Sequence, residues 1–347
     1  MKDFTFKEID TDESFDPIIF CEDTPFTQTR FYGDWQKNLG MSVRRFLVYK
    51  DNEIVAYFQL IKCTLLFGKS YLYVPYDPVT KNYSDSFLAT LKEGLKRIAK
   101  TEKAVFVRLD FTPPINSAKY YKKLKKYFTK APIYTYHSAC FQPRSEWFLD
   151  LRKTKDQILK EMQKNARYSI HLAEKKNVKT EIVTKDFEKY FDTFYELMLI
   201  TAKRRAFNLR SRSYYENIFQ NLKSYNSYLS IAKYDGKIVS IYVLIQYGKI
   251  ANHIFGCSSN ERREFAPTYL AHWSAICYAK SMGAIYYNFG GGDVRKQSGV
   301  DNLIHFKKKF GGFEVSYSDF FDVVIEPFWY HLYNLRKLLK TIYEKIS

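Results

Sequence analysis

Two similar stretches, far apart in the chain, limit its fold more than any other feature. VYKDNEIVAYFQLI and AKYDGKIVSIYVLI each look like two strands joined by a two-residue turn, Asp51-Asn52 in the first and Asp235-Gly236 in the second. Ile54 and Ile238 occupy matching positions, an offset of 238 − 54 = 184 residues. Each hairpin precedes a strand, a helix and a short apolar strand, which reads AVFVRLDF in the first half and AIYYNFGG in the second. The chain therefore contains two copies of one α/β unit.

This order of elements predicts an α/β (α+β) fold with two GNAT-like acyltransferase domains in tandem. Each domain should hold a mixed, mostly antiparallel sheet with flanking helices. The length of 347 residues also favours two domains over one. We expect residues 1–146 plus 318–347 to form the first domain and residues 147–317 to form the second.

The last predicted helix spans residues 327–346 and should return to the first domain. Its apolar residues recur at helical spacing and need a surface to cover them. They are Phe328, Leu332, Leu335, Leu339, Ile342 and Ile346. The alternative is a role for Trp329, Tyr330 and Arg336 at a membrane surface.

A glycine-rich strand end and a lysine triplet suggest a site of chemistry in the second half. Gly290–Gly292 directly follow the apolar run 284–289, as happens where a backbone turns sharply or lets a ligand approach closely. Lys307, Lys308 and Lys309 then stand between two phenylalanines and precede a glycine pair. These lysines cannot all face one way, so at least one can point towards the glycines. A cation there suits a developing oxyanion or a phosphate, and the alternative is a solvated basic helix with a glycine C-cap.

The net charge of +18 favours a polyanionic partner, such as nucleic acid, nucleotide phosphates or an anionic membrane surface. The stretch 153–179 is particularly rich in lysine and arginine. The five cysteines are scattered, without a CxxC motif or a Cys/His cluster of metal spacing, which indicates reduced thiols, no metal site and a cytoplasmic protein. No apolar run approaches the ~20 residues of a membrane span, so any membrane contact is expected to be peripheral, at the inner face.

Several longer motifs resemble the FemABX family of aminoacyltransferases, whose members carry twin GNAT-like domains. In the second half these are KNARYSIHLAEKKNVKTEI, RRAFNLRSRSYYENIF, APTYLAHWSAICYAKSMGAIYYNFGGG and FKKKFGGFEVSYSDFFDVV. The first half offers FTQTRFYGDWQK and VRLD. The chain has no room for the helical arm of some family members and is similar to the compact ones.

The resemblance implies transfer of an amino acid from aminoacyl-tRNA to the stem-peptide amine of a peptidoglycan precursor, either UDP-MurNAc-pentapeptide or lipid II. That reaction builds the interpeptide bridge. Aminolysis of a reactive ester needs an amine, an oxyanion stabiliser and positioning, so we expect no cofactor. The implied partners are aminoacyl-tRNA and the precursor, and we expect a monomer.

The resemblance also implies roles for particular residues. Lys307 matches the lysine that stabilises the tetrahedral intermediate, and Asp110 matches an acid that can act as a base or merely accept hydrogen bonds at a strand end. Arg210, with Tyr214 four residues later, matches the arginine that holds the diphosphate of the precursor. Either Lys37 or Gln36 takes a second phosphate position. Further substrate contacts are implied for Phe255, Asn288, Gly290 and Gly291. Two features depart from the family pattern: Asn288 stands where an aspartate is usual, and His253 and Phe255 stand where tyrosines are common.

Two other functions fit the composition. An acyl-CoA-dependent GNAT N-acetyltransferase would need a pyrophosphate loop of the form R/Q-x-x-G-x-G/A between a strand and a helix, and neither repeat contains one. A non-enzymatic, basic RNA-binding protein would explain the charge but not the glycine and lysine elements.

Overall fold

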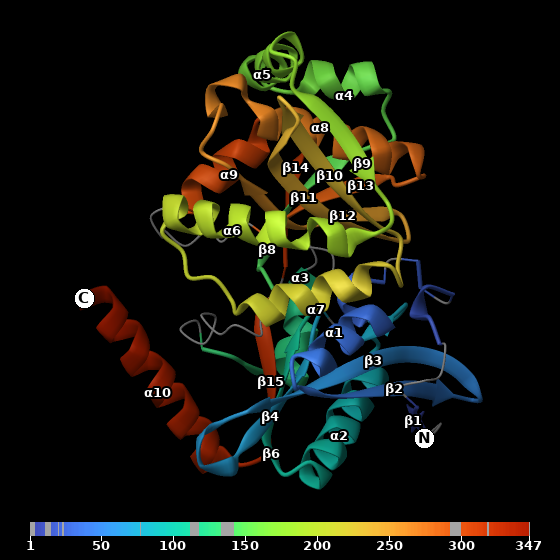
Figure 1. Ribbon diagram of the computed structural model, residues 1–347. Coiled ribbons are helices and arrows are strands. Elements are labelled where there is room, and N and C mark those ends of the chain that lie inside the picture. The colour runs from blue at the N-terminus through green and yellow to red at the C-terminus, as the bar shows by residue number, and fades with distance from the viewer. Residues whose placement is uncertain are drawn as a thin grey trace. The chain divides into compact units, whose positions relative to one another are not determined.

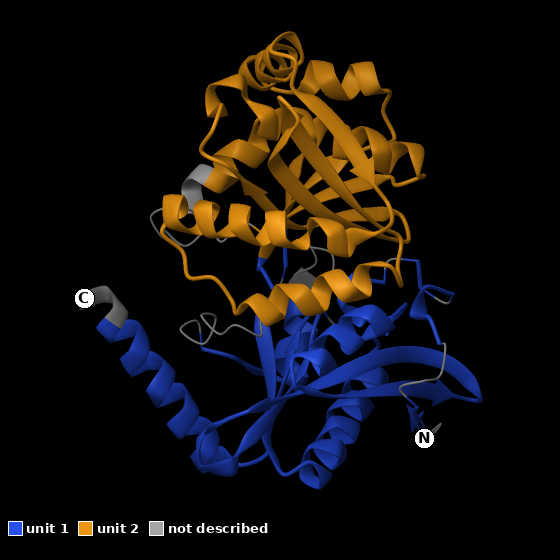
Figure 2. Cartoon of the chain, viewed as in Figure 1, with its two compact units in different colours: residues 1–144, 316–347 blue, residues 145–315 orange. Residues whose placement is uncertain are grey.

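The computed structural model describes residues 4–10, 15–19, 21–22, 24–76, 78–111, 118–132, 142–291, 300–317 and 319–346. The chain divides into two compact units (Figure 2). Unit 1 contains residues 1–144 and 316–347, and unit 2 contains residues 145–315. These limits lie close to the predicted domain boundaries of 146 and 318. That each unit is a domain in its own right stays a prediction.

Unit 1 is built on one mixed sheet (Figure 1). Its strands are ordered β1-β2-β3-β4-β6-β15-β7, and β5 pairs with β3. The strands are β1 (Phe4–Ile9), β2 (Ser42–Lys50), β3 (Glu53–Thr64), β4 (Ser70–Val74), β5 (Val79–Thr80), β6 (Ala104–Asp110), β7 (Thr129–Lys130) and β15 (Phe320–Val324). Only β4 and β6 run parallel, because the helix between them reverses the chain direction.

Helices cover both faces of this sheet. They are α1 (Arg30–Asn38), α2 (Asp85–Thr101), α3 (Ala118–Tyr127) and α10 (Pro327–Ile346). α2 starts at the cap residue Ser84 and buries Leu88, Leu91 and Leu95 against the sheet, as their helical spacing predicts. α1 is capped by Thr29, whose side chain accepts from the backbone N–H of Tyr32, and a short helical turn, Phe26–Gln28, comes before it.

Unit 2 contains a second mixed sheet with the order β14-β8-β13-β12-β11-β10-β9. The strands are β8 (Ser145–Asp150), β9 (Lys179–Val183), β10 (Ser227–Tyr234), β11 (Lys237–Tyr247), β12 (Ile250–Ser258), β13 (Tyr286–Gly291) and β14 (Phe313–Ser316). The helices are α4 (Lys155–Glu161), α5 (Lys164–Lys175), α6 (Phe191–Arg205), α7 (Arg212–Leu222), α8 (Pro267–Ser281) and α9 (Val300–Lys308). α4 and α5 are separate helices, because Met162 and Gln163 between them have extended backbone.

The two sheets have the same order of elements, and their hairpins share the same irregularity in strand pairing. β2-β3-β4 with α2 and β6 corresponds to β10-β11-β12 with α8 and β13, and in both copies the strand after the helix pairs in parallel. Both hairpin turns have two central residues with positive φ, as type I′ turns require. Each hairpin also has a register shift, after Val48 in the first and after Ala232 in the second, again 232 − 48 = 184 residues apart. The predicted duplication and GNAT-like fold are confirmed.

α10 packs on unit 1 through its first turns, but not through the expected residues. Tyr330 and Tyr333 are buried against Phe106, with ring centroids 5.3 and 5.1 Å away. The Tyr330 hydroxyl donates to Asp322, which forms a fully buried, two-pronged ion pair with Arg108. The return of this helix to unit 1 is therefore confirmed. The prediction that the apolar stripe is the buried face is wrong. Its members with described side chains are exposed, namely Phe328, Leu332, Leu335, Leu339 and Ile342.

Candidate functional site

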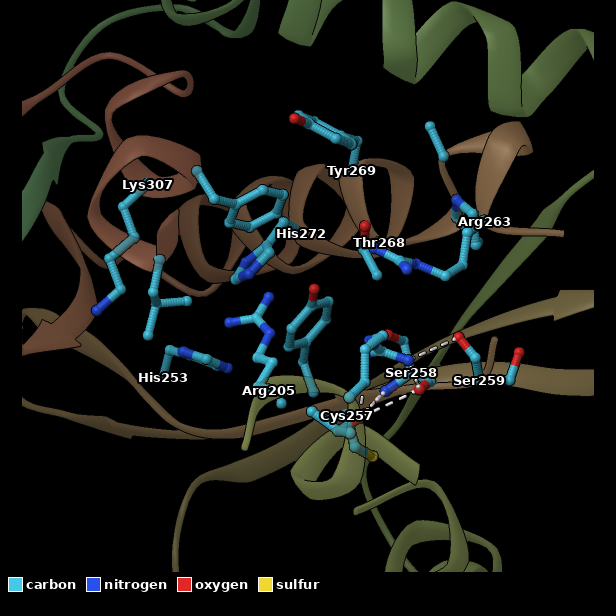
Figure 3. Close-up of a pocket in the computed structure, with 18 of the residues that line it drawn as sticks. Arg205, His253, Cys257, Ser258, Ser259, Arg263, Thr268, Tyr269, His272 and Lys307 are labelled. Carbon is cyan, nitrogen blue, oxygen red and sulfur yellow. Dashed lines mark hydrogen bonds between the residues drawn. The ribbon is translucent and has the colours of Figure 1, made fainter. Parts of the chain in front are cut away.

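Unit 2 holds a cavity of about 270 Å³ that several separate elements line (Figure 3). The C-terminal turn of α6 contributes Thr201, Arg204 and Arg205, and the start of α8 contributes residues 266–269 and His272. The remaining lining comes from Tyr242 on β11, residues of β12 and the loop after it, Phe289 on β13, and α9. Lys307 and His253 lie at one end of the cavity and Arg263 lies at the other.

Lys307 is tied to the glycine turn, as the sequence predicts for at least one lysine of the triplet. Its Nζ donates to the carbonyl oxygens of Gly290, at 2.9 Å, and Gly291, at 2.5 Å. Gly290 has a φ of +76°, and a Cβ there would lie 3.3 Å from the backbone oxygen of His253. Asn288 fixes the same turn, since its Oδ1 accepts from the N–H of Gly290 at 2.8 Å and its amide donates to Asn252. An ammonium has three donors, so two bonds to carbonyls leave one for a substrate.

Burial controls the charges at this end of the cavity. It lowers the pKa of Lys307 to about 8, against an opposing contribution from Glu146, so the group is mainly cationic at neutral pH. Burial and, to a lesser extent, the neighbouring Lys307 cation lower the pKa of His253 to about 4. The pKa of His272 is lowered well below its usual value for the same reasons. Both histidines are therefore neutral, and Lys307 is the charged group of this trio.

The other two lysines of the triplet point elsewhere. The Nζ of Lys308 lies 5.4 Å from the ring centroid of Trp147, and its side chain is exposed. Lys309 donates to the hydroxyl of Tyr269 at 3.3 Å. The glycine pair that follows has φ values of +81° and +87°, so α9 also ends in the glycine turn that the alternative interpretation expected.

Three arginines line the rest of the cavity: Arg263 lies at the opposite end, whereas Arg205 lies nearer to His253 and its charge also acts on Lys307. Arg204 already bonds to the carbonyl oxygens of Ser258 and Ser259 and thereby holds the loop after β12 in place. Burial and the positive charges of Arg263 and Arg205 lower the pKa of Arg204. Among the described residues, no carboxylate pairs with Arg205 or Arg263, and both side chains are exposed. α8 begins here without a side-chain cap, so its first N–H groups add to the positive potential. This end of the cavity suits a phosphate.

A basic surface continues from the cavity over α5. The ammonium of Lys176 lies 5.3 Å from the ring of Phe265, and Arg262 lies 5.6 Å from the same ring. Phe265 belongs to the short turn Arg263–Phe265 at the mouth of the cavity. The exposed side chains of Lys164, Lys175 and Lys179 extend this surface along α5 and the start of β9.

Arg210 and Tyr214 lie together in the segment that leads into α7. The guanidinium carbon of Arg210 is 5.7 Å from the ring centroid of Tyr214, and the arginine is exposed. Tyr214 in turn contacts Phe255, at 6.4 Å between ring centroids. Phe255 packs against Tyr215 of α7, whereas His253, two residues earlier, contacts His272 of α8. A bulge in β12 at Ile254, where Val243 pairs with Phe255 but Leu244 pairs with His253, explains why residues two apart contact different helix layers.

The candidate residues of unit 1 lie on two elements. Gln36 and Lys37 are half-buried in the last turn of α1, where Lys37 Nζ is 4.0 Å from the carboxylate of Asp34. Asp110 is buried at the end of β6 and accepts hydrogen bonds from the Tyr73 hydroxyl, at 2.5 Å, and from the backbone N–H of Tyr76. These bonds fit the hydrogen-bond acceptor interpretation of Asp110. Its role as a base stays a prediction.

Sequence reasoning missed the cavity itself. Arg205, Arg263 and His272 lie on three elements, and no motif links them. The basic doublets Arg204-Arg205 and Arg262-Arg263 resemble many surface arginines, and the two quoted motifs that contain Arg205 and His272 do not indicate that these residues share a cavity. In the described part of the chain, no cluster of three or more His, Cys, Asp or Glu residues could hold a metal ion. Cys257 borders the cavity, but burial raises the pKa of its thiol, so it is a poor nucleophile.

Comparison with known proteins shows which proteins this chain is similar to. The lipid II:glycine glycyltransferase of Staphylococcus aureus (strain MRSA252) is 25% identical, with 87% of this chain and 88% of that protein covered. The crystal structure of FemX superposes with a TM-score of 0.82 at 22% identity, over 95% of this chain and 100% of that chain. A tandem GNAT protein from the clavulanic acid biosynthesis pathway gives a TM-score of 0.53 at 11% identity, over 92% of this chain and 98% of that chain, and shares the fold alone.

The family model agrees with the motifs that suggested this resemblance. The model of the FemAB family matches residues 20–238 and 231–338, which together span nearly all of both units. This chain is a member of the FemAB family.

Proposed function

We propose that this protein transfers an amino acid from aminoacyl-tRNA to the stem-peptide amine of a peptidoglycan precursor and so builds the interpeptide bridge. One observation carries the proposal: a single cavity has a buried cation on a glycine turn at one end, Arg263 at the other end and Arg205 between them. Family membership and relatives named lipid II:glycine glycyltransferase support the same reaction class.

The cavity suits the aminoacylated 3′ end of a tRNA. At about 270 Å³ it is slightly smaller than typical ligand pockets of ~300–1,000 Å³, so it fits the end of a long substrate better than a whole one. Arg205, Arg263 and the start of α8 would hold the terminal phosphates. The basic surface over α5 would then contact the backbone of the acceptor stem.

Lys307 would act on the transition state. The acceptor amine attacks the ester carbonyl, a C–N bond forms, and negative charge develops on the carbonyl oxygen. When the intermediate collapses, the C–O ester bond breaks, the tRNA 3′-oxygen gains a proton and the new amide nitrogen loses one. A cation already held by Gly290 and Gly291 stabilises the oxyanion without reorganisation during the reaction. The ester supplies the driving force, so this scheme uses no cofactor.

The acceptor contacts are part of the same proposal. Arg210, stacked on Tyr214, would clamp the diphosphate of the precursor. A phosphate contact by Lys37 or Gln36 of unit 1 stays a prediction from the family resemblance. Phe255 supports Tyr214 from β12. Asn288 acts by holding the turn at Gly290. We place the protein in the cytoplasm as a monomer, at the inner membrane face when the acceptor is lipid-linked.

The deciding experiment is a transfer assay with purified protein. Mixed aminoacyl-tRNAs are incubated with UDP-MurNAc-pentapeptide, and in parallel with lipid II, and the mass gain of each acceptor is measured. We expect a gain of one aminoacyl residue on at least one acceptor. If neither gains mass while tRNA binds tightly, the protein is an RNA-binding module instead.

A matched arm tests acyl-CoA as the donor, because Arg263 and the start of α8 would also hold the phosphates of that molecule. Thermal protection by acetyl-CoA, together with acetyl transfer and no aminoacyl transfer, would identify an N-acetyltransferase. We expect protection by aminoacyl-tRNA and none by acetyl-CoA.

A further inference from the structure

The last helix presents an apolar face that unit 1 leaves uncovered. Its packed side holds Tyr330, Tyr333 and Asn334, which are at most 8% exposed. The opposite side holds Phe328, Leu332, Leu335, Leu339 and Ile342, which are 40–72% exposed. These five recur at intervals of three and four residues and so form one stripe along four turns. Because α10 is 20 residues long, this stripe runs for roughly 20–30 Å.

A loop of the same unit continues this apolar stripe. Between β3 and β4, Leu66 and Phe67 are 51% and 79% exposed. The ring of Phe67 lies 6.0 Å from that of Trp329 at the start of α10. Phe67 has a φ of +57°, a conformation that is unfavourable for a bulky residue. We call these two loop residues, Trp329 and the five stripe residues the α10 surface.

Basic residues border the α10 surface. Arg336 and Lys340 are exposed on one side of the stripe, and Lys69 lies 5.1 Å from the ring of Trp329. The helix sequence has four basic residues, Arg336, Lys337, Lys340 and Lys345, and one acidic residue, Glu344. An apolar stripe with a basic border and aromatic residues at one end is typical of helices that lie in the headgroup region of a bilayer.

We propose that the α10 surface docks on an anionic membrane. The apolar side chains would enter the boundary between headgroups and acyl chains, and Arg336 and Lys340 would contact anionic headgroups. A second copy of the chain is a poorer occupant, because pairing two such stripes brings two basic borders together in a protein of net charge +18. The described residues contain no helix long and apolar enough to cross a membrane.

This proposal extends the proposed location at the membrane but rests only on contacts within unit 1. Docking there would hold the protein beside a lipid-linked acceptor. Vesicle binding can occur even if the transfer assay fails, and transfer to a soluble precursor can occur without vesicles, so the two proposals fail separately.

The test is flotation of the full-length protein with vesicles. We expect binding to vesicles of equal parts phosphatidylglycerol and phosphatidylcholine, and at least tenfold weaker binding to phosphatidylcholine alone. Leu335→Ser combined with Leu339→Ser should weaken binding to the mixed vesicles by about tenfold or more. The matched control, Leu199→Ser, changes a leucine of α6 that is 48% exposed and should leave binding unchanged.

Charge reversal separates the two contributions to binding. Arg336→Glu should weaken binding to the mixed vesicles, whereas Lys122→Glu, an exposed position on α3, should not. All these side chains are exposed, so circular dichroism should report unchanged folding. Equal vesicle binding by the double leucine variant would overturn the proposal. A second result would also overturn the proposal: the wild-type protein is a dimer in sedimentation velocity and the double leucine variant is a monomer. In that case a second copy of the chain would cover the stripe.

Discussion

At the scale of single residues, Lys307 combines three properties that rarely occur together. It is only 4% exposed, its pKa is lowered to about 8, and two backbone carbonyls fix its Nζ. Such an ammonium is poorly solvated and already positioned, so it interacts strongly with a charge that develops during reaction. Its two neighbours in the triplet have neither the burial nor the contact with the glycine turn.

Replacing Lys307 should therefore affect the reaction step more than binding. Lys307→Met keeps the bulk and removes the charge, and we expect kcat for transfer to fall by ~100-fold or more with little change in KM. Lys308→Met is the control, because its side chain is exposed beside Trp147, and it should retain near wild-type kcat. A wild-type rate for the Lys307 variant would exclude its proposed role.

The lowered pKa of Lys307 makes a second, independent prediction. The ammonium is present below about pH 8 and is lost as the pH rises through that value. Lys307→Arg stays charged over this range. The ratio of wild-type to Lys307→Arg single-turnover rates should therefore fall above about pH 8, because titration of the acceptor amine affects both proteins equally. A constant ratio would mean that the charge of Lys307 is not used.

Arg210 should matter for binding of the precursor. Arg210→Ala should weaken binding by roughly 1.5–3 kcal/mol, the usual value of a charged hydrogen bond, and raise KM for the precursor with kcat nearly unchanged. Arg212→Ala serves as the control, because that nearby exposed arginine already pairs with Asp192. Equal KM values for both variants would remove Arg210 from the site.

At the scale of elements, the sequence predicts those features that depend on the conformation of a few neighbouring residues. The hairpins were predictable because Asp51-Asn52 and Asp235-Gly236 are residues that accept positive φ. The cavity was not, because α6, β12, α8 and α9 meet there only through tertiary packing. The packed face of α10 was mispredicted because the exposed stripe of the helix is more apolar than the face that packs. The packed face holds Tyr330 and Tyr333, which lie around the buried ion pair of Arg108 and Asp322. Periodicity finds an apolar face but not the surface that covers it.

The glycine turn after β13 offers an element-scale test. Gly290→Ala and Gly236→Ala both place a side chain at a φ near +75°, which should cost each protein about 1–2 kcal/mol of unfolding free energy. Of these two glycines, Gly290 has a backbone oxygen, that of His253, 3.3 Å from the added Cβ, whereas Gly236 has no atom within 4 Å. We therefore expect Gly290→Ala alone to lower the transfer rate, by about tenfold or more, because its carbonyl moves away from Lys307. Chemical denaturation and the transfer assay measure the two effects, and equal activity of the variants would contradict the assignment.

At the scale of the whole molecule, the stretch 153–179, where the proposed donor would bind, holds eight lysine and arginine residues against three acidic ones. If tRNA lies along α5 and reaches the cavity past Arg262 and Arg263, most of its contacts are with phosphates. We expect affinity for tRNA to fall by on the order of 10³-fold between about 50 and about 200 mM salt. Lys176→Glu should make this salt dependence less steep, whereas Lys100→Glu, on α2 of unit 1, should not. Affinity independent of salt would place tRNA elsewhere or exclude it.

The position of β15 has a consequence for how this chain folds during synthesis. Unit 2 is one continuous segment, 145–315, so a ribosome completes it before residues 316–347 exist. Until then the sheet of unit 1 lacks the strand between β6 and β7, and Arg108 has no Asp322 beside it. A buried guanidinium without its counter-ion is strongly destabilising, so the part of the chain made first cannot reach its final structure first. Unit 1 can therefore complete its sheet only after residues 316–347 have been made, whereas unit 2 has all the strands of its sheet before that point.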